Sequence, residues 1–66
     1  MIIKINGKKE DFKEKTTLLE LIKDKKIDSA TIAVEYNQKI ISKEEFDKII
    51  LKDKDKLEIL TFVGGG

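Results

Sequence analysis

The residues of this chain that could take part in chemistry lie at its C-terminal end. The sequence finishes with Gly64-Gly65-Gly66, directly after the apolar run 57–63. Glycine has no Cβ, so such a tail can adopt backbone angles closed to other residues and can enter a narrow channel. Fully extended, three residues reach roughly 10 Å, at ~3.3–3.6 Å per residue. A carboxylate on Gly66, held away from the body, suits a carrier that another enzyme activates. A tail without any function is the alternative.

The rest of the composition offers little chemistry. The sequence has no Cys and no His, so it lacks a thiol nucleophile, a thiolate metal site and a Ser–His–Asp set. No acid–base pair has an obvious pocket, and we expect no enzyme activity of the chain's own. Asp53 and Asp55 fall short of the about six to eight oxygens that calcium takes. We therefore expect no metal site and no bound cofactor.

The charge is dense but balanced, with 14 lysines, 13 acidic residues and a net charge of +1. Lysines and acids alternate closely, as in Lys52-Asp53-Lys54-Asp55, which indicates solvated turns rather than a surface of a single sign. Without arginine or a basic block, nucleic-acid binding is not expected.

Targeting signals are not expected either. No apolar stretch approaches the ~20 residues that a membrane span needs. Met1 already belongs to a strand pattern, so we expect no signal peptide and a cytoplasmic location.

The first half of the sequence predicts a hairpin and a helix. Apolar residues alternate from Met1 to Ile5, and Asn6-Gly7 favours a type I′ turn into a polar strand at 8–13, anchored by Phe12. Thr17 and Glu20 have the spacing of a capping box, which opens an amphipathic helix of about ten residues. Ile27 is expected to pack inward where this helix ends.

The second half predicts three more strands. Alternation over 30–36 places Ile32, Val34 and Tyr36 on one face, and Asn37-Gln38 marks a turn into a short strand at 39–41. Ser42 and Glu45 suggest a second capping box, which opens a short helix carrying Phe46. The last strand covers 57–63.

This order predicts an α+β fold in a single domain, 1–66, with 64–66 as a flexible glycine tail. The best match is the β-grasp, or ubiquitin-like, roll: a mixed sheet with one main helix on one face and a short second helix. In that roll the last strand lies beside the first strand and parallel to it.

The last strand also predicts a contact surface. If Leu57, Ile59 and Thr61 face the core, Leu60 and Phe62 point outward beside the tail and form a docking patch for a partner. We expect Val63 and Gly64 to extend that contact. The alternative is that Phe62 folds onto the edge of the core. The other candidates are expected to be structural: satellite core positions for Phe12 and Phe46, structural or solvent-facing positions for Glu35 and Tyr36, and a turn alone for Asn6-Gly7.

Three stretches of the sequence, 34–46, 51–60 and 63–66, together resemble the ThiS family of bacterial sulfur carriers of thiamine biosynthesis. The likeness covers the β-grasp order, the length and the diglycine end. The chain departs from the family at Lys54, where an Asp-Gly-Asp pattern typically has glycine. Because that change concerns turn geometry, it leaves the expected activity unaffected.

The resemblance implies that Gly66 carries the reaction and that Gly65 and Gly64 provide access. A ThiF-type adenylyltransferase would use ATP and Mg²⁺ to adenylate the Gly66 carboxylate. Sulfur from a desulfurase system would then form a thiocarboxylate for a thiazole synthase of the ThiG type. Other recipients fit the same tail: a molybdopterin synthase, for which the chain would be the small subunit, or a target lysine, for which it would be a ubiquitin-like modifier. A β-grasp interaction domain with an inert tail is a further alternative.

Overall fold

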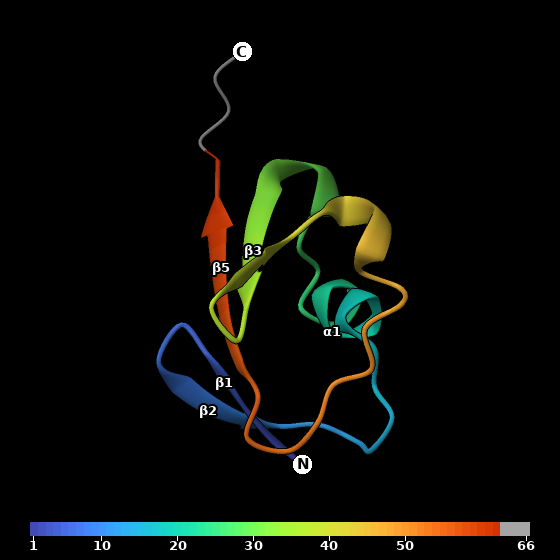
Figure 1. Cartoon of the computed structure of the whole chain (residues 1–66), viewed down its shortest axis with the longest axis vertical. Coiled ribbons are helices and arrows are strands. Elements are labelled where there is room, and N and C mark those ends of the chain that lie inside the picture. Colours follow the sequence, from blue (N-terminus) through green and yellow to red (C-terminus); the bar gives the residue numbers. More distant parts are fainter. Residues whose placement is uncertain (63–66) are drawn as a thin grey trace.

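Within residues 1–62, five strands and one α-helix follow one another in the order that the sequence predicts (Figure 1). The computed structural model describes residues 1–62. The elements are β1 (Ile2–Ile5), β2 (Lys8–Asp11), α1 (Leu18–Asp24), the 3₁₀ turn η1 (Ser29–Thr31), β3 (Ile32–Tyr36), β4 (Lys39–Ile41), the 3₁₀ turn η2 (Lys43–Glu45) and β5 (Lys56–Thr61).

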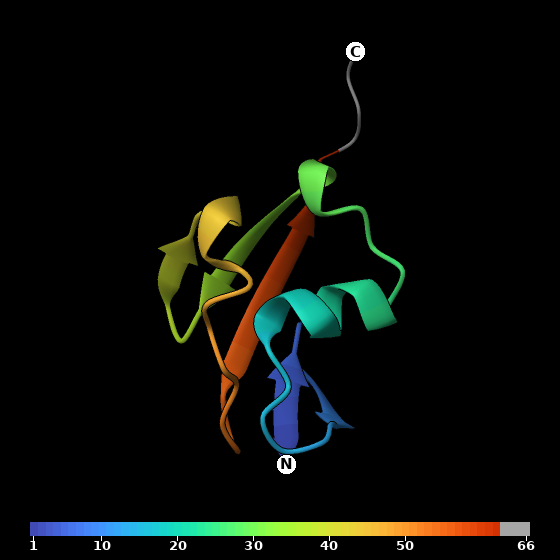
Figure 2. The ribbon, with the colours of Figure 1, turned by 90° about the vertical axis from the view of Figure 1, so that its right-hand side faces the viewer.

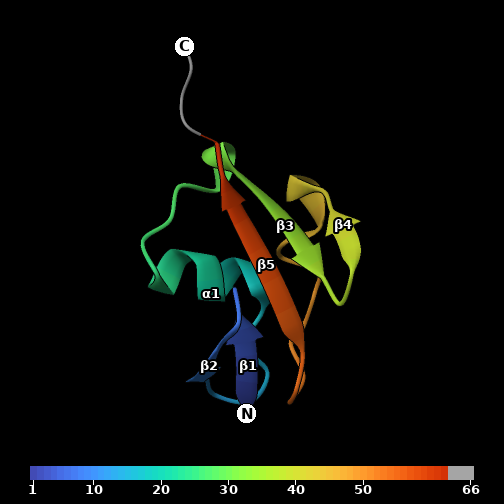
Figure 3. The same cartoon turned by 90° about the vertical axis from the view of Figure 1, so that its left-hand side faces the viewer.

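The strands form one mixed sheet in the order β2-β1-β5-β3-β4. β5 runs parallel to β1, with Lys4 beside Lys56, and antiparallel to β3. The predicted parallel pairing of the first and last strands is therefore confirmed. α1 lies across one face of the sheet (Figure 2), and within residues 1–62 the opposite face carries no helix (Figure 3). This is the β-grasp arrangement.

Two tight turns set the register of the two hairpins. Asn6 and Gly7 have φ values of 49° and 85°, as the type I′ prediction requires. Asn37 and Gln38, with φ of 48° and 73°, make an equivalent turn between β3 and β4. Asparagine tolerates this left-handed region better than most residues.

The N-terminus of α1 has the predicted capping box. The Thr17 side chain accepts a hydrogen bond from the Glu20 N–H at 3.1 Å, and the Glu20 carboxylate accepts one from the Thr17 N–H at 2.9 Å. That backbone hydrogen bond also holds the pKa of Glu20 below its usual value. The helix has 7 residues rather than the predicted ten or so, because Lys26 turns left-handed with φ 58°. The backbone then leaves the helix, and the Ile27 N–H caps its last turn by donating to the Ile22 carbonyl at 3.2 Å.

The second half of the chain corrects two boundary predictions. Ala30 and Thr31 belong to η1 rather than to β3, because the Asp28 carboxylate accepts the Ala30 N–H at 2.9 Å. The capping box predicted at Ser42 is wrong. The Ser42 hydroxyl donates to the Glu45 carboxylate at 3.1 Å, and the Glu45 N–H bonds to the Ser42 carbonyl at 2.9 Å, closing a 3₁₀ turn.

The core lies between α1 and the covered face of the sheet. Its buried side chains are Ile3, Ile5, Leu18, Leu21, Ile22, Ile32, Val34, Phe46, Leu51, Leu57 and Ile59. The satellite position predicted for Phe46 is wrong, because its side chain is only 2% exposed and its carbonyl accepts the Leu19 N–H at 3.0 Å. Phe12 does pack against the outside of this core.

Candidate functional site

The candidate site begins where β5 ends. Thr61 is paired with Ile32, and the Phe62 N–H donates to the Thr31 carbonyl at 2.8 Å. In Figure 1 β5 points away from the end of the molecule where Met1 lies. The predicted site residues Val63, Gly64, Gly65 and Gly66 lie outside the described residues, so their roles stay predictions.

Leu60 and Phe62 are exposed at the end of β5, with 61% and 60% of their surfaces accessible. Leu57 and Ile59 are buried, so the predicted alternation is confirmed over 57–60, but Thr61, expected to face the core, is exposed. Phe62 does not fold onto the core. Leu60 lies opposite Ala33 of β3 on the open face of the sheet. The exposure of Leu60 and Phe62 permits contact with a partner, while their part in binding one stays a prediction.

The start of β5 is held by a buried carboxylate. Asp55 is 8% exposed and accepts hydrogen bonds from the Tyr36 hydroxyl at 2.7 Å, the Asn37 side-chain amide at 3.1 Å and the Lys52 N–H at 2.7 Å. Burial, together with Asp55, raises the pKa of Tyr36 to about 12. The prediction that the Lys/Asp cluster is a solvated turn is therefore wrong for Asp55. The structural role expected for Tyr36 agrees with these contacts.

The middle of β5 is held by a residue whose role sequence reasoning missed. The Asn6 side chain accepts the Ile59 N–H at 2.7 Å and donates to the Ile59 carbonyl at 3.1 Å. The Asn6 N–H also donates to the Leu57 carbonyl at 2.9 Å. Asn6 thus continues the pairing of β1 with β5 after the backbone of β1 has turned away. The predicted Asn6-Gly7 turn was already sufficient reason for an asparagine at this position. Nothing else in the sequence indicated its hydrogen bonds to the Ile59 backbone.

The turn before β5 is fastened to β1. The Asp53 carboxylate accepts the Ile2 N–H at 2.6 Å, and the Lys54 N–H donates to the Ile2 carbonyl at 2.8 Å. Lys54 takes φ 74°, a left-handed conformation that glycine adopts without strain. Both carboxylates of this turn, Asp53 and Asp55, are engaged by the protein itself.

No metal site or membrane span is found within residues 1–62. No group of three or more acidic, histidine or cysteine side chains is placed there to hold a metal ion. None of the helices in this part of the chain has the length and apolar character needed to cross a membrane.

Comparison with known proteins gives the family. The model of the ThiS family matches residues 2–66. This chain belongs to the ThiS family. It is 36% identical over 66 residues to the sulfur carrier protein ThiS of Bacillus subtilis, covering 98% of this chain and 100% of that protein. The crystal structure of a thiamine biosynthesis protein, ThiS, from Geobacter metallireducens superimposes with a TM-score of 0.86 at 33% identity, covering all of both chains.

A larger relative contains a similar domain as one part of a longer polypeptide. A thiazole synthase from Paramagnetospirillum magneticum is 38% identical over 66 residues, which is 100% of this chain but 20% of that protein. The chain thus spans the whole of the two ThiS proteins just named and about one fifth of this thiazole synthase. In that relative a ThiS-like part belongs to the same polypeptide as the remainder of a thiazole synthase.

Proposed function

We propose that this protein is a sulfur carrier of thiamine biosynthesis and that Gly66 carries the sulfur as a C-terminal thiocarboxylate. The observation that carries the proposal is the match of almost the entire chain to the ThiS family. The structure supports it because β5 is fixed along its length by Asp55, Asn6 and β3. The last described strand is therefore firmly held up to Thr61, directly before the proposed tail.

The proposed chemistry takes place on the tail, in two steps. A carboxylate is a poor acceptor for sulfur because oxide is a very poor leaving group. Adenylation of Gly66 by ATP forms an acyl-adenylate and releases pyrophosphate. Sulfide then attacks the acyl carbon, AMP leaves with the electron pair of the broken C–O bond, and a thiocarboxylate remains. One difficult exchange becomes two easier ones, as in covalent catalysis.

The proposed partners supply what the chain lacks. A ThiF-type adenylyltransferase would bind the ATP and Mg²⁺, a desulfurase system would provide sulfur, and a ThiG-type thiazole synthase would receive it. The polypeptide shared in the Paramagnetospirillum relative supports the last of these. Leu60, Phe62, Val63 and Gly64 would contact the partner, while Gly65 and Gly64 would allow the tail to enter its active site. This chain would be a cytoplasmic carrier without enzyme activity.

Intact mass tests the proposal directly. The protein is incubated with the adenylyltransferase from the same genome, ATP, Mg²⁺ and sulfide. We expect a mass gain equal to the exchange of one oxygen for one sulfur, localised to Gly66. No gain with a demonstrably active adenylyltransferase would favour the inert-tail alternative.

Gly65→Val tests the role of the tail. We expect adenylation to be lost, because a branched side chain blocks the narrow entry, while the midpoint of urea unfolding stays that of the wild type. Lys48→Val, at an exposed position outside the tail, is the control and should be adenylated normally. Undiminished adenylation of Gly65→Val would contradict the threading of the tail.

A further inference from the structure

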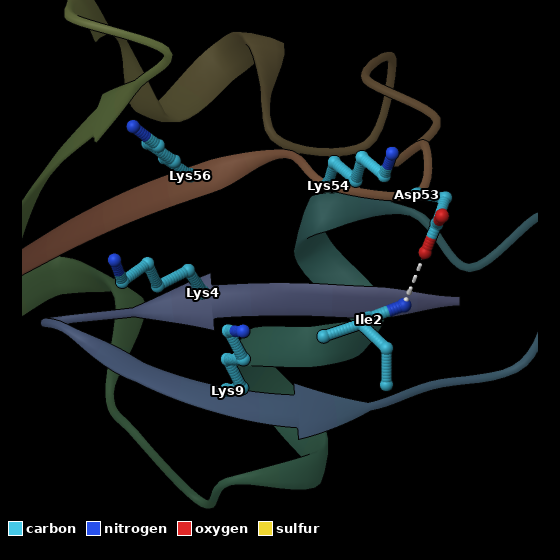
Figure 4. Close-up of a pocket in the computed structure, with 6 residues that line it drawn as sticks. All are labelled: Ile2, Lys4, Lys9, Asp53, Lys54 and Lys56. Carbon is cyan, nitrogen blue, oxygen red and sulfur yellow. Dashed lines mark hydrogen bonds between the residues drawn. The ribbon is translucent and has the colours of Figure 1, made fainter.

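Lysines gather on the open face of the sheet, on three adjacent strands. The register places Lys9 of β2 opposite Lys4 of β1, and Lys4 beside Lys56 of β5. Lys54 flanks this row, and Figure 4 shows the four side chains around a hollow of about 430 Å³, lined also by Ile2 and Asp53. Within residues 1–62, none of these lysines forms an ion pair with a carboxylate.

An acidic row and an apolar row follow on the same face, toward the end of β5. Glu58 of β5 lies directly opposite Glu35 of β3, and the next outward residue of β5, Leu60, lies opposite Ala33. Glu35 also lies opposite Ile40 of β4, an exposed side chain. Figure 3 views the sheet from this side, where β5 crosses the middle. Along β5 the face is thus basic at Lys56, acidic at Glu58 and apolar at Leu60 and Phe62.

This order is unfavourable for the isolated domain. Like charges on directly opposite residues of neighbouring strands destabilise a sheet, and opposite charges stabilise it. Exchanging Lys56 and Glu58 would convert both contacts, Lys4 with position 56 and Glu35 with position 58, into attractive ones. The arrangement becomes favourable when a second surface brings charges of the opposite sign to each row.

We infer that this face docks a protein whose surface presents acidic, basic and apolar side chains in that order, with an acidic group entering the hollow between the lysines. The inference rests on the proposed function, because the docked protein would be an enzyme that acts on the tail beyond Phe62. Thiazole synthase is the partner, since a relative carries the same domain and a thiazole synthase in one polypeptide. A nucleic acid or an anionic membrane fits less well, because Glu35 and Glu58 would repel it from the centre of the face.

A charge exchange on β5 tests the inference without changing composition. The variant Lys56→Glu/Glu58→Lys keeps the net charge and reverses the order of the first two rows. Its control, Lys43→Glu/Glu44→Lys, exchanges two exposed residues of η2. Binding to the thiazole synthase from the same genome is measured by calorimetry for the full chain and both variants, and thermal unfolding is recorded in parallel.

We expect the two readouts to move in opposite directions. The β5 exchange should weaken binding roughly tenfold or more. The exchanged residues at positions 56 and 58 would then each face a charge of the same sign on the synthase. It should also raise Tm by a few degrees, because both cross-strand pairs become attractive. The η2 exchange should leave binding within about twofold of the wild type.

Several results would overturn the inference. The first is that the Lys56→Glu/Glu58→Lys variant binds the synthase as tightly as the wild type. The second is that this variant and its control lose the same amount of affinity, and the third is that the unchanged chain does not bind the synthase. Binding of the unchanged chain to phosphatidylglycerol vesicles or to a single-stranded DNA 20-mer, lost in Lys56→Glu, would assign the face to another class of partner. Because binding is measured without adenylation, these failures are distinct from a failure of the thiocarboxylate experiment.

Discussion

The two ends of β5 are held in different ways. At its start, Leu57 is 1% exposed between β1 and β3, and the Lys56 N–H donates to the Asn37 side chain at 2.9 Å. At its end, Leu60 is 61% exposed, and the register pairs Thr61 with β3 alone. One strand therefore concentrates stability where it begins and offers exposed apolar surface where it ends. This division keeps the body folded while the apolar end of the strand stays accessible for contact.

The largest contrast is expected between two leucines of this strand. Leu57→Ala should lower the free energy of unfolding by about 2–5 kcal/mol, because it leaves a cavity in the core. Leu60→Ala should change it by less than about 0.5 kcal/mol, because the side chain is exposed. Urea unfolding followed by circular dichroism measures both. Similar losses for the two variants would mean that the end of β5 contributes to the core as much as its start.

Asp55→Ala should have the next largest effect. It leaves the Tyr36 hydroxyl, the Asn37 amide and the Lys52 N–H without their acceptor, at a cost of about 2–3 kcal/mol. Asp47→Ala, at an exposed carboxylate, is the matched control and should fall within about 0.5 kcal/mol of the wild type. If both variants unfold at the same urea concentration, Asp55 does not anchor the start of the strand.

The smallest effect is expected at the turn before β5. Lys54→Gly should raise the free energy of unfolding by about 0.5–1 kcal/mol, because relief of the left-handed strain exceeds the added freedom of the unfolded chain. Lys56→Gly, two residues further on and inside the strand, should lower it by about 0.5–1 kcal/mol. The same sign for both changes would show that the backbone angle at Lys54 carries no strain.

Local patterns predicted most of this fold. The capping box of Thr17 and Glu20, the turn at Asn6-Gly7 and the alternation over 57–60 each depend on residues close together in sequence, so a short window contains the whole signal. The order of the elements then limited the topology enough to predict the parallel pairing of β1 and β5. The chemistry followed from the glycines and their carboxylate, and the partners followed from family resemblance alone.

The contacts that the sequence did not reveal join distant residues. Asn6 and Ile59 are 53 positions apart, and Asp55 is 19 from Tyr36. Each side chain had a sufficient local explanation, as a turn former or as a solvated acid, and only the packed sheet brings the partners together. Phe46 was misjudged for the same reason, since a 3₁₀ turn has no periodicity long enough to show which face is buried.

The central position of the last strand has a consequence for biosynthesis. A ribosome delivers β1 early and β5 after all the other strands, yet β5 lies between β1 and β3. Until it arrives, the neighbouring edges of β1 and β3 have no partner strand, and the core lacks Leu57 and Ile59. The nascent chain can form its hairpins and helix, but the long-range closure that completes the sheet must wait. The body formed by residues 1–62 is therefore complete only once its last strand has been synthesised and inserted.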